Sequence, residues 1–263
     1  MAPENVAIAF ENVSKAYEAG ARPALDGVSL TVAQGEFLAV VGASGSGKTT
    51  LLRLVNRLTD PTSGTVRVSG TNVRTTDAVS LRRQIGYVFQ GIGLFPHMTV
   101  AENIAVTPKL LGADRRQMAA RVDELLDLAR LDRTAYRDRF PRELSGGERQ
   151  RVGVARAIAA KPQIVLMDEP FGALDPLTRD ALGQDYRSLH DALGLTTVMV
   201  THDIVEALLL ADRIAIMQQG RVLEHGTPHA LMQSRQAGVR DLMQTPRRQA
   251  QRLGAMLAGG SAA

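Results

Sequence analysis

Gly42–Thr49 reads GASGSGKT and matches the pattern G-x-x-x-x-G-K-[ST] of a phosphate-binding loop (P-loop). An apolar run, FLAVV at Phe37–Val41, precedes the loop, and LLRLVNRL follows it with apolar residues at helical spacing. The glycines allow the backbone to curl tightly and point its N–H groups at phosphate oxygens, and the N-terminus of the helix adds a favourable dipole. A strand, a glycine loop and a helix in this order predict an α/β fold with a nucleotide site.

Nucleotide contacts are expected throughout this loop and the start of its helix. Lys48 is placed to reach the β- and γ-phosphates, and the Thr49 hydroxyl to ligate Mg²⁺. The alternative is a glycine-rich turn that binds nothing, and the flanking strand and helix argue against it. The expected ATP-binding residues of the loop are Gly42, Ala43, Ser44, Gly45, Ser46, Gly47, Lys48, Thr49 and Thr50.

A second motif lies at Ile164–Asp168, where IVLMD is followed by Glu169. Its apolar residues predict a strand buried in a parallel sheet, with a carboxylate at the edge where α/β folds bind ligands. Asp168 is expected to hold Mg²⁺, partly through water, and Glu169 to polarise an attacking water. The alternative is a pair of solvated acids at a strand end. A magnesium-binding threonine in the same chain favours a P-loop nucleotidase.

The composition limits the class of protein. The chain has 263 residues, no Cys and 44% hydrophobic residues, which excludes disordered, fibrous and disulfide-rich classes and Cys-ligated zinc. No apolar run approaches the ~18 residues that span a bilayer, and the N-terminus lacks the pattern of a secretory leader, so a cytoplasmic protein is expected. The formal net charge of +4 does not distinguish nucleic acid, anionic lipid and nucleotide as partners.

Strands are expected on both sides of a long helical stretch. The first 41 residues contain three short β-branched or aromatic runs, whereas residues 91 to 161 show helical patterns and no obvious strand. We interpret this stretch as a helical lobe inserted into an α/β core. The helix after the P-loop is expected to end at Asp60-Pro61, and a hairpin to turn at Gln219-Gly220. Other helices are expected over 115–131, 146–160 and 176–193, and other strands over 65–70, 85–90, 164–168, 196–203 and 214–226.

Leu144–Gln150 reads LSGGERQ and has two compatible interpretations. Ser145 followed three residues later by Glu148 predicts a capping box that starts a helix. A Ser hydroxyl and two glycine N–H groups at a helix N-terminus also form an anion site, and a capping box alone does not need Gly146 and Gly147. With this stretch between the two nucleotide motifs, the sequence resembles the ATP-binding cassette (ABC) family over about residues 6 to 243. The residues that match the family signature are Leu144, Ser145, Gly146, Gly147, Glu148 and Gln150.

The resemblance implies a P-loop NTPase fold, in which an α/β, RecA-like core carries an antiparallel β subdomain and an inserted helical lobe. It implies that Tyr17 stacks on adenine, against the alternative of an ordinary strand-end tyrosine. It also implies that Gln90 senses Mg²⁺ and lobe rotation, and that His202 contacts the γ-phosphate. Ala173, Leu174 and Asp175 match the dimer-contacting loop of the family, and His97, His190, His225 and His229 match no catalytic position.

The resemblance further implies partners. Two copies would meet head to tail and enclose two ATP molecules, each between the P-loop of one copy and the signature of the other, with Mg²⁺ as cofactor. A cassette without a membrane span implies separate permease subunits and a solute-binding protein, and a position on the inner face of the cell membrane. No nucleic acid is expected, because soluble relatives that act on it usually carry two cassettes or long insertions. A short, basic, flexible tail is expected over 244–263, after the cassette at 6–243.

The segment 84–112, which includes IGLFPHMTVAENIA and VTPKLLG, resembles the cassettes of quaternary-amine importers for osmoprotectants such as glycine betaine and choline. The alternative is that FPHMTV and ENI are common to importers in general, and PKLLG is the less common element. Gly91 departs from the subgroup, which has a second glutamine there. No regulatory module follows the cassette within the 263 residues, so sensing of ionic strength through one is not expected. An importer for another solute, such as an amino acid, a metal chelate or a sulfonate, is the other alternative.

Overall fold

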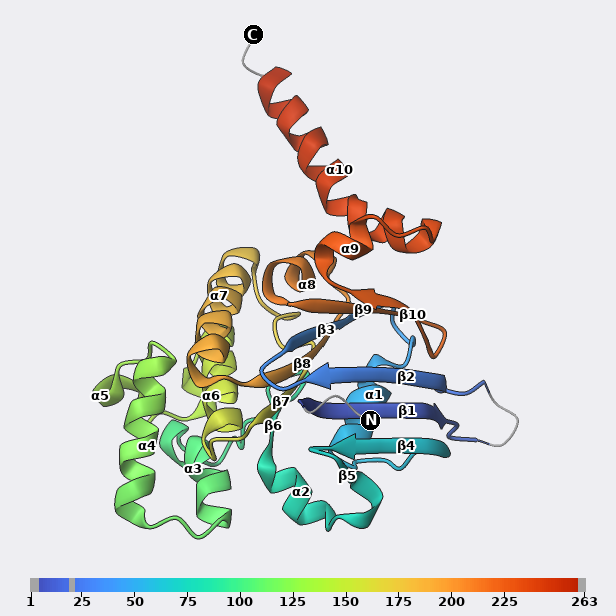
Figure 1. Cartoon of the computed structure of the whole chain (residues 1–263). Coiled ribbons are helices and arrows are strands. Elements are labelled where there is room, and N and C mark those ends of the chain that lie inside the picture. Colours follow the sequence, from blue (N-terminus) through green and yellow to red (C-terminus); the bar gives the residue numbers. More distant parts are fainter. Residues whose placement is uncertain (1–4, 19–21, 260–263) are drawn as a thin grey trace.

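The strands of the computed structural model, which describes residues 5–18 and 22–259, form two sheets (Figure 1). One sheet is antiparallel, and the other is parallel except for its edge strand β10, which pairs with β9 as a hairpin. The first has the order β2 (Leu25–Ala33), β1 (Val6–Lys15), β4 (Ser63–Val68) and β5 (Thr71–Asn72). The second has the order β10 (Arg221–Gly226), β9 (Arg213–Gln218), β3 (Phe37–Val41), β8 (Thr196–Thr201), β7 (Ile164–Asp168) and β6 (Ile85–Val88).

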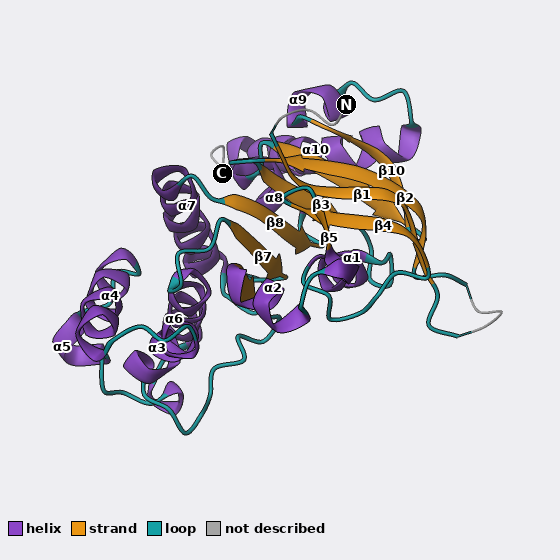
Figure 2. Cartoon of the chain, turned by 60° about the horizontal axis from the view of Figure 1, so that its bottom comes forward, coloured by secondary structure: helices purple, strands orange, loops and turns teal. Residues whose placement is uncertain are grey.

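One group of helices lies together on one side of the molecule. α3 to α6 gather on the side of the molecule away from the antiparallel sheet (Figure 2), and the described residues from 91 to 161 contain no strand. This arrangement confirms the α/β class with an inserted helical lobe. The helices are α1 (Lys48–Val55), α2 (Ala78–Gln84), α3 (Val100–Leu110), α4 (Arg115–Leu128), α5 (Arg133–Tyr136), α6 (Gly146–Ile158), α7 (Pro176–Leu193), α8 (Ile204–Leu210), α9 (Pro228–Met232) and α10 (Ala237–Gly259), with 3₁₀ turns η1 (Val73–Thr75) and η2 (Pro141–Glu143).

β3 is the central strand because both of its faces are buried. Phe37, Ala39 and Val41 lie in one apolar cluster, together with side chains of α6 and α7. Leu38 and Val40 lie in a second cluster, which α1 and the antiparallel sheet complete. A strand buried on both faces reads as the continuous apolar run seen in the sequence. The P-loop therefore starts from a strand that is buried on both faces.

The helix after the P-loop is shorter than expected. α1 ends at Val55 rather than near Asp60-Pro61, and Leu58 lies outside it with 47% of its surface exposed. Arg57 takes a left-handed φ of 53°, and the Leu58 N–H donates to the Arg53 carbonyl at 2.8 Å. This hydrogen bond and the left-handed residue form the helix-ending motif that usually carries glycine, and with arginine in that place the end of the helix could not be predicted from the sequence.

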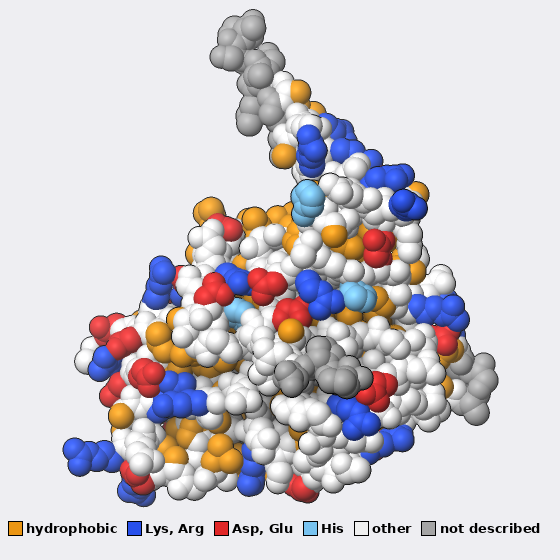
Figure 3. All heavy atoms as spheres, viewed as in Figure 1, with side chains coloured by type: hydrophobic (Ala, Val, Ile, Leu, Met, Phe, Trp, Pro, Cys, Tyr) orange, Lys and Arg blue, Asp and Glu red, His pale blue; other side chains and the backbone are white. Residues whose placement is uncertain are grey.

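The C-terminal segment also differs from expectation. Regular structure was expected to weaken after Met243, but α10 continues to Gly259 and projects from the body of the molecule (Figure 1). Val239 and Met243 anchor its first turns, because both are almost completely buried. Ala, Arg, Gln, Leu and Met, which favour helix, dominate the rest. Arg side chains gather along the projecting part (Figure 3).

No helix in the described part of the chain is both long enough and apolar enough to cross a bilayer.

Candidate nucleotide-binding site

The P-loop between β3 and α1 curls through left-handed backbone. Gly45 and Gly47 have φ of 76° and 104°, a region that glycine enters without the steric cost of a β-carbon. Gly47 has a second reason to lack a side chain, because an added Cβ would lie 2.3 Å from the carbonyl oxygen of Ala24. Gly47 is also the N-cap of α1 and offers no side-chain acceptor, so the first N–H groups of α1 are available to an anion.

Two buried polar side chains of the loop fit a phosphate ligand. Ser46 is 4% exposed, and its Oγ has no hydrogen-bond partner among the described residues. A buried hydroxyl without a partner costs about 1–3 kcal/mol of folding free energy. A bound phosphate that accepts a hydrogen bond from Ser46 Oγ would remove this cost. Lys48 Nζ donates to the carbonyls of Gly42 and Ala43 at 2.7 and 3.0 Å. Burial lowers the pKa of Lys48, and two nearby carboxylates oppose that shift.

Thr49 and Asp168 join the two motifs. The Thr49 hydroxyl donates to Asp168 Oδ1 at 3.0 Å, at the carboxyl end of β7. Burial raises the pKa of Asp168, and the hydrogen bond from Thr49 opposes that shift. Hydroxyl and carboxylate oxygens are ligands that Mg²⁺ prefers. The described residues contain no group of three or more His, Cys, Asp or Glu that could hold a metal, so phosphate and water would have to complete the coordination of Mg²⁺.

Glu169 lies at the meeting point of three strand ends. Gln90, just after β6, donates from Nε2 to Glu169 Oε2 at 3.3 Å. His202, just after β8, brings its Nδ1 to 3.4 Å from the same oxygen. The Glu169 backbone is left-handed, with φ of 46°, and its N–H donates to the Val200 carbonyl. The fold therefore brings together Gln90, Glu169 and His202, which lie far apart in the sequence.

Tyr17 lies beside the start of α1. Its hydroxyl is 3.3 Å from Thr50 Oγ1, and 59% of its surface is exposed. The Lys15 ammonium lies 5.0 Å from the ring centre. An exposed ring next to the P-loop helix is available for stacking on a base.

The signature starts α6 through the predicted capping box. The Glu148 N–H donates to Ser145 Oγ at 3.3 Å, and the Ser145 N–H donates to Glu148 Oε2 at 2.7 Å. The Tyr136 hydroxyl donates to the other Glu148 oxygen at 2.6 Å and is the main cause of the lowered pKa of Glu148. Gln150 is buried, and its Nε2 has no partner among the described residues. Tyr136 was missed because it precedes the motif by eight residues.

The signature lies against the start of α7 rather than against the P-loop. A Cβ on Gly147 would lie 2.6 Å from Thr178 Cγ2, and one on Gly146 would lie 3.9 Å from Leu174 Cδ2. Asp175 caps α7 by accepting the Thr178 N–H at 3.1 Å. Among the described residues, no hydrogen bond or ion pair joins residues 144–150 to residues 42–50. Ala173, Leu174 and Asp175 thus form the turn that the signature contacts.

Arg179 connects this turn to the loop after β8, and sequence reasoning missed it. Its guanidinium donates to the Leu174 carbonyl and to Asp203 Oδ2, each at 3.1 Å. Asp203 follows His202 directly and caps α8. Arg179 stands four residues after Asp175, one helical turn away. That spacing was the available signal.

Comparisons with known proteins identify the family of the chain. The family model described as "ABC transporter" matches residues 25–172. The chain belongs to the ABC transporter family.

The relatives of this ABC cassette include several importer subunits. The chain is 49% identical over 227 residues to the choline transport ATP-binding protein OpuBA of Bacillus subtilis, covering 86% of this chain and 59% of that protein. It is 46% identical to the osmoprotectant import ATP-binding protein OsmV of Salmonella typhimurium, covering 86% and 60%. It is 48% identical to the glycine betaine uptake protein YehX of Escherichia coli, covering 86% and 72%. The chain spans about three-fifths of the length of the first two.

Solved structures share the fold of the cassette. The dimeric structure of the bacterial ABC transporter cassette MJ0796 superposes with a TM-score of 0.76 at 36% identity, over 84% of this chain and 98% of that one. A second structure of MJ0796, a post-hydrolysis state bound to ADP and Pi, has a TM-score of 0.74 at 35% identity.

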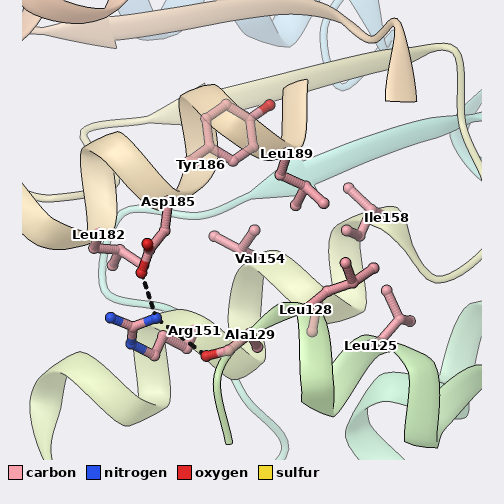
Figure 4. Close-up of a pocket in the computed structure, with 11 residues that line it drawn as sticks. Leu125, Leu128, Ala129, Arg151, Val154, Ile158, Leu182, Asp185, Tyr186 and Leu189 are labelled. Carbon is pink, nitrogen blue, oxygen red and sulfur yellow. Dashed lines mark hydrogen bonds and ion pairs between the residues drawn. The ribbon is translucent and has the colours of Figure 1, made fainter. Parts of the chain in front are cut away.

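The helical lobe of the cassette is tied to α7 at a small cavity of about 20 Å³ (Figure 4). Arg151 of α6 donates to Asp185 Oδ2 of α7 at 2.8 Å and to the Ala129 carbonyl at 3.1 Å. Arg130 pairs with the other oxygen of Asp185 at 2.7 Å. One carboxylate thus holds two arginines at the junction of α4, α6 and α7.

Proposed function

We propose that this cassette binds and hydrolyses ATP with Mg²⁺ and drives solute uptake through a separate membrane permease. The observation that carries the proposal is the hydrogen bond of 3.0 Å between Thr49 and Asp168. It joins the phosphate-binding loop to the acid-tipped strand, and Glu169 follows directly. A structural nucleotide site would not need Glu169 to converge with Gln90 and His202.

Each residue has a role in this proposal. Lys48 and the N–H groups of the P-loop bind the β- and γ-phosphates, and Thr49 and Asp168 hold the metal. Mg²⁺, when bound, neutralises charge that develops on the phosphates. Glu169 accepts a proton from the attacking water, Gln90 orients the Glu169 carboxylate, and His202 contacts the γ-phosphate. Most of the acceleration comes from positioning and charge stabilisation, as in other phosphoryl transfers.

The second copy of the chain completes the site in the proposal. Since no hydrogen bond or ion pair of the described residues joins the signature to the P-loop of its own chain, its Ser145 hydroxyl and glycine N–H groups would serve an ATP molecule held by a partner copy. Leu177 supports an interface here, because it lies beside the dimer-contacting turn with 85% of its surface exposed.

The permease is expected to dock at the groove beside Gln90. Phe89, Phe95 and Leu58 line a cavity of about 260 Å³ there, and each is at least 40% exposed. An apolar groove of this kind suits a short amphipathic helix. Motion of Gln90 would then reach the permease through its immediate neighbours. In this proposal the cassette lies at the cytoplasmic face of the membrane and does not act on nucleic acid.

The proposed solute is a quaternary-amine osmoprotectant of the glycine betaine or choline type. The choline, osmoprotectant and glycine betaine proteins above support it, at 46–49% identity. A sulfate/thiosulfate import protein of Caulobacter vibrioides at 48% identity supports the alternative of a sulfur oxyanion. Isolation of the cassette with its permease and binding protein, followed by uptake assays with labelled choline, glycine betaine and sulfate, decides between them. Uptake of sulfate alone overturns the osmoprotectant assignment.

Two variants test the hydrolytic role. Lys48→Ala should weaken ATP binding or abolish turnover, because it removes the cation that faces the phosphates. Glu169→Gln should keep ATP affinity within about twofold, lower turnover by ~100-fold or more, and accumulate an ATP-bound dimer in size-exclusion chromatography. Lys109→Ala and Glu11→Gln, at exposed sites far along the chain from both motifs, are matched controls. Normal steady-state hydrolysis by Glu169→Gln refutes the general-base role.

A further inference from the structure

The loop that follows Gln90 has an unusual backbone. Gly91, Ile92 and Gly93 all have left-handed φ, of 82°, 70° and 58°. A β-branched residue rarely adopts this region, because its side chain crowds the backbone there. The Ile92 N–H donates to the Phe89 carbonyl at 3.0 Å, which closes a tight turn around Gln90. Something outside the turn must hold Ile92 in this conformation.

Arg156 of α6 provides that hold. Its guanidinium donates to the Gly93 carbonyl at 2.7 Å and to the Ile92 carbonyl at 2.8 Å. Only 8% of Arg156 is exposed, and burial lowers the pKa of its guanidinium. No carboxylate in the described part of the chain forms an ion pair with it, although the Phe95 ring lies 5.9 Å away. The buried Arg156 guanidinium thus donates its hydrogen bonds to two backbone carbonyl oxygens of one turn.

The shape of arginine explains why it occupies this position. Its planar fork can place two N–H donors on two adjacent carbonyls, whereas the lysine ammonium is a single point of charge. α6 also approaches Ile92 directly, because a Cβ on Gly153 would lie 3.2 Å from Ile92 Cγ2. Position 153 is three residues before 156 and therefore on the same face of α6. One face of α6 grips both the side chain and the carbonyl of Ile92.

We propose that Arg156 is a positioning residue for Gln90. By fixing the left-handed turn directly after Gln90, Arg156 ties the amide that contacts Glu169 to α6. The signature begins α6, so one helix sets the position of Gln90 in its own chain and of the signature offered to the partner copy. The proposal rests on the proposed function for its consequence on Mg²⁺ and water, but the grip on the turn can be measured without nucleotide.

The test uses the full chain carrying Arg156→Lys, which keeps the charge and loses the fork. Hydrogen–deuterium exchange of the nucleotide-free protein should show faster exchange in the peptide covering 89–98 and unchanged exchange in α4. The Mg²⁺ concentration for half-maximal ATPase activity should rise by about 5- to 10-fold, because Gln90 is loosened. ATP affinity measured without Mg²⁺ should change by less than about twofold, because the P-loop is untouched.

Arg121→Lys is the matched control. Arg121 also donates to two backbone carbonyls, those of Ile158 at 2.9 Å and Ala159 at 3.2 Å, but it does not touch the turn. It should leave the exchange of 89–98 and the Mg²⁺ dependence unchanged. A similar rise in Mg²⁺ requirement with Arg121→Lys would overturn the positioning role, since general loosening of α6 would then suffice.

Ile92→Gly provides a second arm. Glycine adopts the left-handed turn freely, so in the Arg156→Lys background Ile92→Gly should reverse at least half of the rise in the Mg²⁺ concentration for half-maximal activity. Unchanged exchange of 89–98 in Arg156→Lys overturns the proposal whatever the activity. Absence of ATPase activity in the unaltered chain would instead refute the proposed function, and the exchange experiment would still decide whether Arg156 holds the turn.

Discussion

Two loops at the nucleotide site contain left-handed backbone, and they maintain it by different means. In the P-loop the left-handed positions 45 and 47 are glycines, which need no outside support. In the loop after Gln90 the central position is Ile92, whose conformation is held by hydrogen bonds from Arg156, 64 residues further along the chain. The first loop carries its shape in its own residues. The second depends on a contact between distant parts of the fold.

This difference has a functional consequence. A left-handed shape built on glycine carries no steric cost of its own, which suits a loop that must present N–H groups to phosphate. A shape that depends on a tertiary contact can change when the contact moves, which suits a loop expected to respond to lobe rotation. The comparison therefore predicts that the P-loop does not tolerate a side chain at position 47, where an added Cβ meets the Ala24 backbone, and that the turn after Gln90 tolerates several substitutions at position 92.

The largest effect is expected for Gly47→Ala. The new Cβ would lie 2.3 Å from the Ala24 carbonyl oxygen, in addition to the unfavourable φ of 104°. The backbone of the loop must shift, so we expect a loss of more than about 3 kcal/mol in unfolding free energy and loss of ATP binding. Gly45→Ala is the control, because its φ of 76° is similar but no atom lies within 4 Å of the added Cβ.

Gly45→Ala should cost only about 1 kcal/mol, the penalty of the left-handed region itself. Urea denaturation measures both variants, and isothermal titration measures their ATP affinity. Equal losses at positions 45 and 47 would show that conformation alone, and not contact with Ala24, decides the requirement for glycine.

An intermediate effect is expected in the signature, where the constraint comes from a neighbouring side chain. A Cβ on Gly147 would lie 2.6 Å from Thr178 Cγ2. Gly147→Ala should therefore lower the free energy of unfolding, measured by urea denaturation, by about 1–2 kcal/mol, although alanine has the better helix propensity. In a Thr178→Ala background the same substitution should become neutral or stabilising. A cost that persists in the double variant contradicts the steric explanation.

The sequence was sufficient to predict those parts of the site whose functional residues form a short, continuous motif. The P-loop, the acid-tipped strand and the signature were each visible as short motifs, and their strands and helices follow from apolar periodicity. Roles for Gln90 and His202 were expected only through the family resemblance, and no local pattern predicts that these two residues meet Glu169. The structure supplies that meeting point through the order β8, β7, β6.

The residues that were missed act through tertiary contacts. Tyr136 and Arg156 each bind a group that is distant in sequence or on another element, so no spacing rule selects them, and Arg179 offered only its position one helical turn after Asp175. The early end of α1 was missed for a related reason. Arg57 takes the left-handed position that glycine usually fills, stabilised by its hydrogen bond to the Thr76 carbonyl at 2.8 Å.

The smallest effect, and the sharpest test of the comparison, concerns Ile92. Ile92→Ala removes the side chain but keeps a Cβ in the left-handed region, whereas Ile92→Gly removes both the side chain and the strain. At an ordinary position glycine is less stable than alanine by about 0.5–1 kcal/mol. At position 92 we expect the opposite sign, with Ile92→Gly more stable than Ile92→Ala by about the same amount in urea denaturation. If Ile92→Ala proves more stable than Ile92→Gly, the turn carries no strain, and Arg156 is not needed to keep it left-handed.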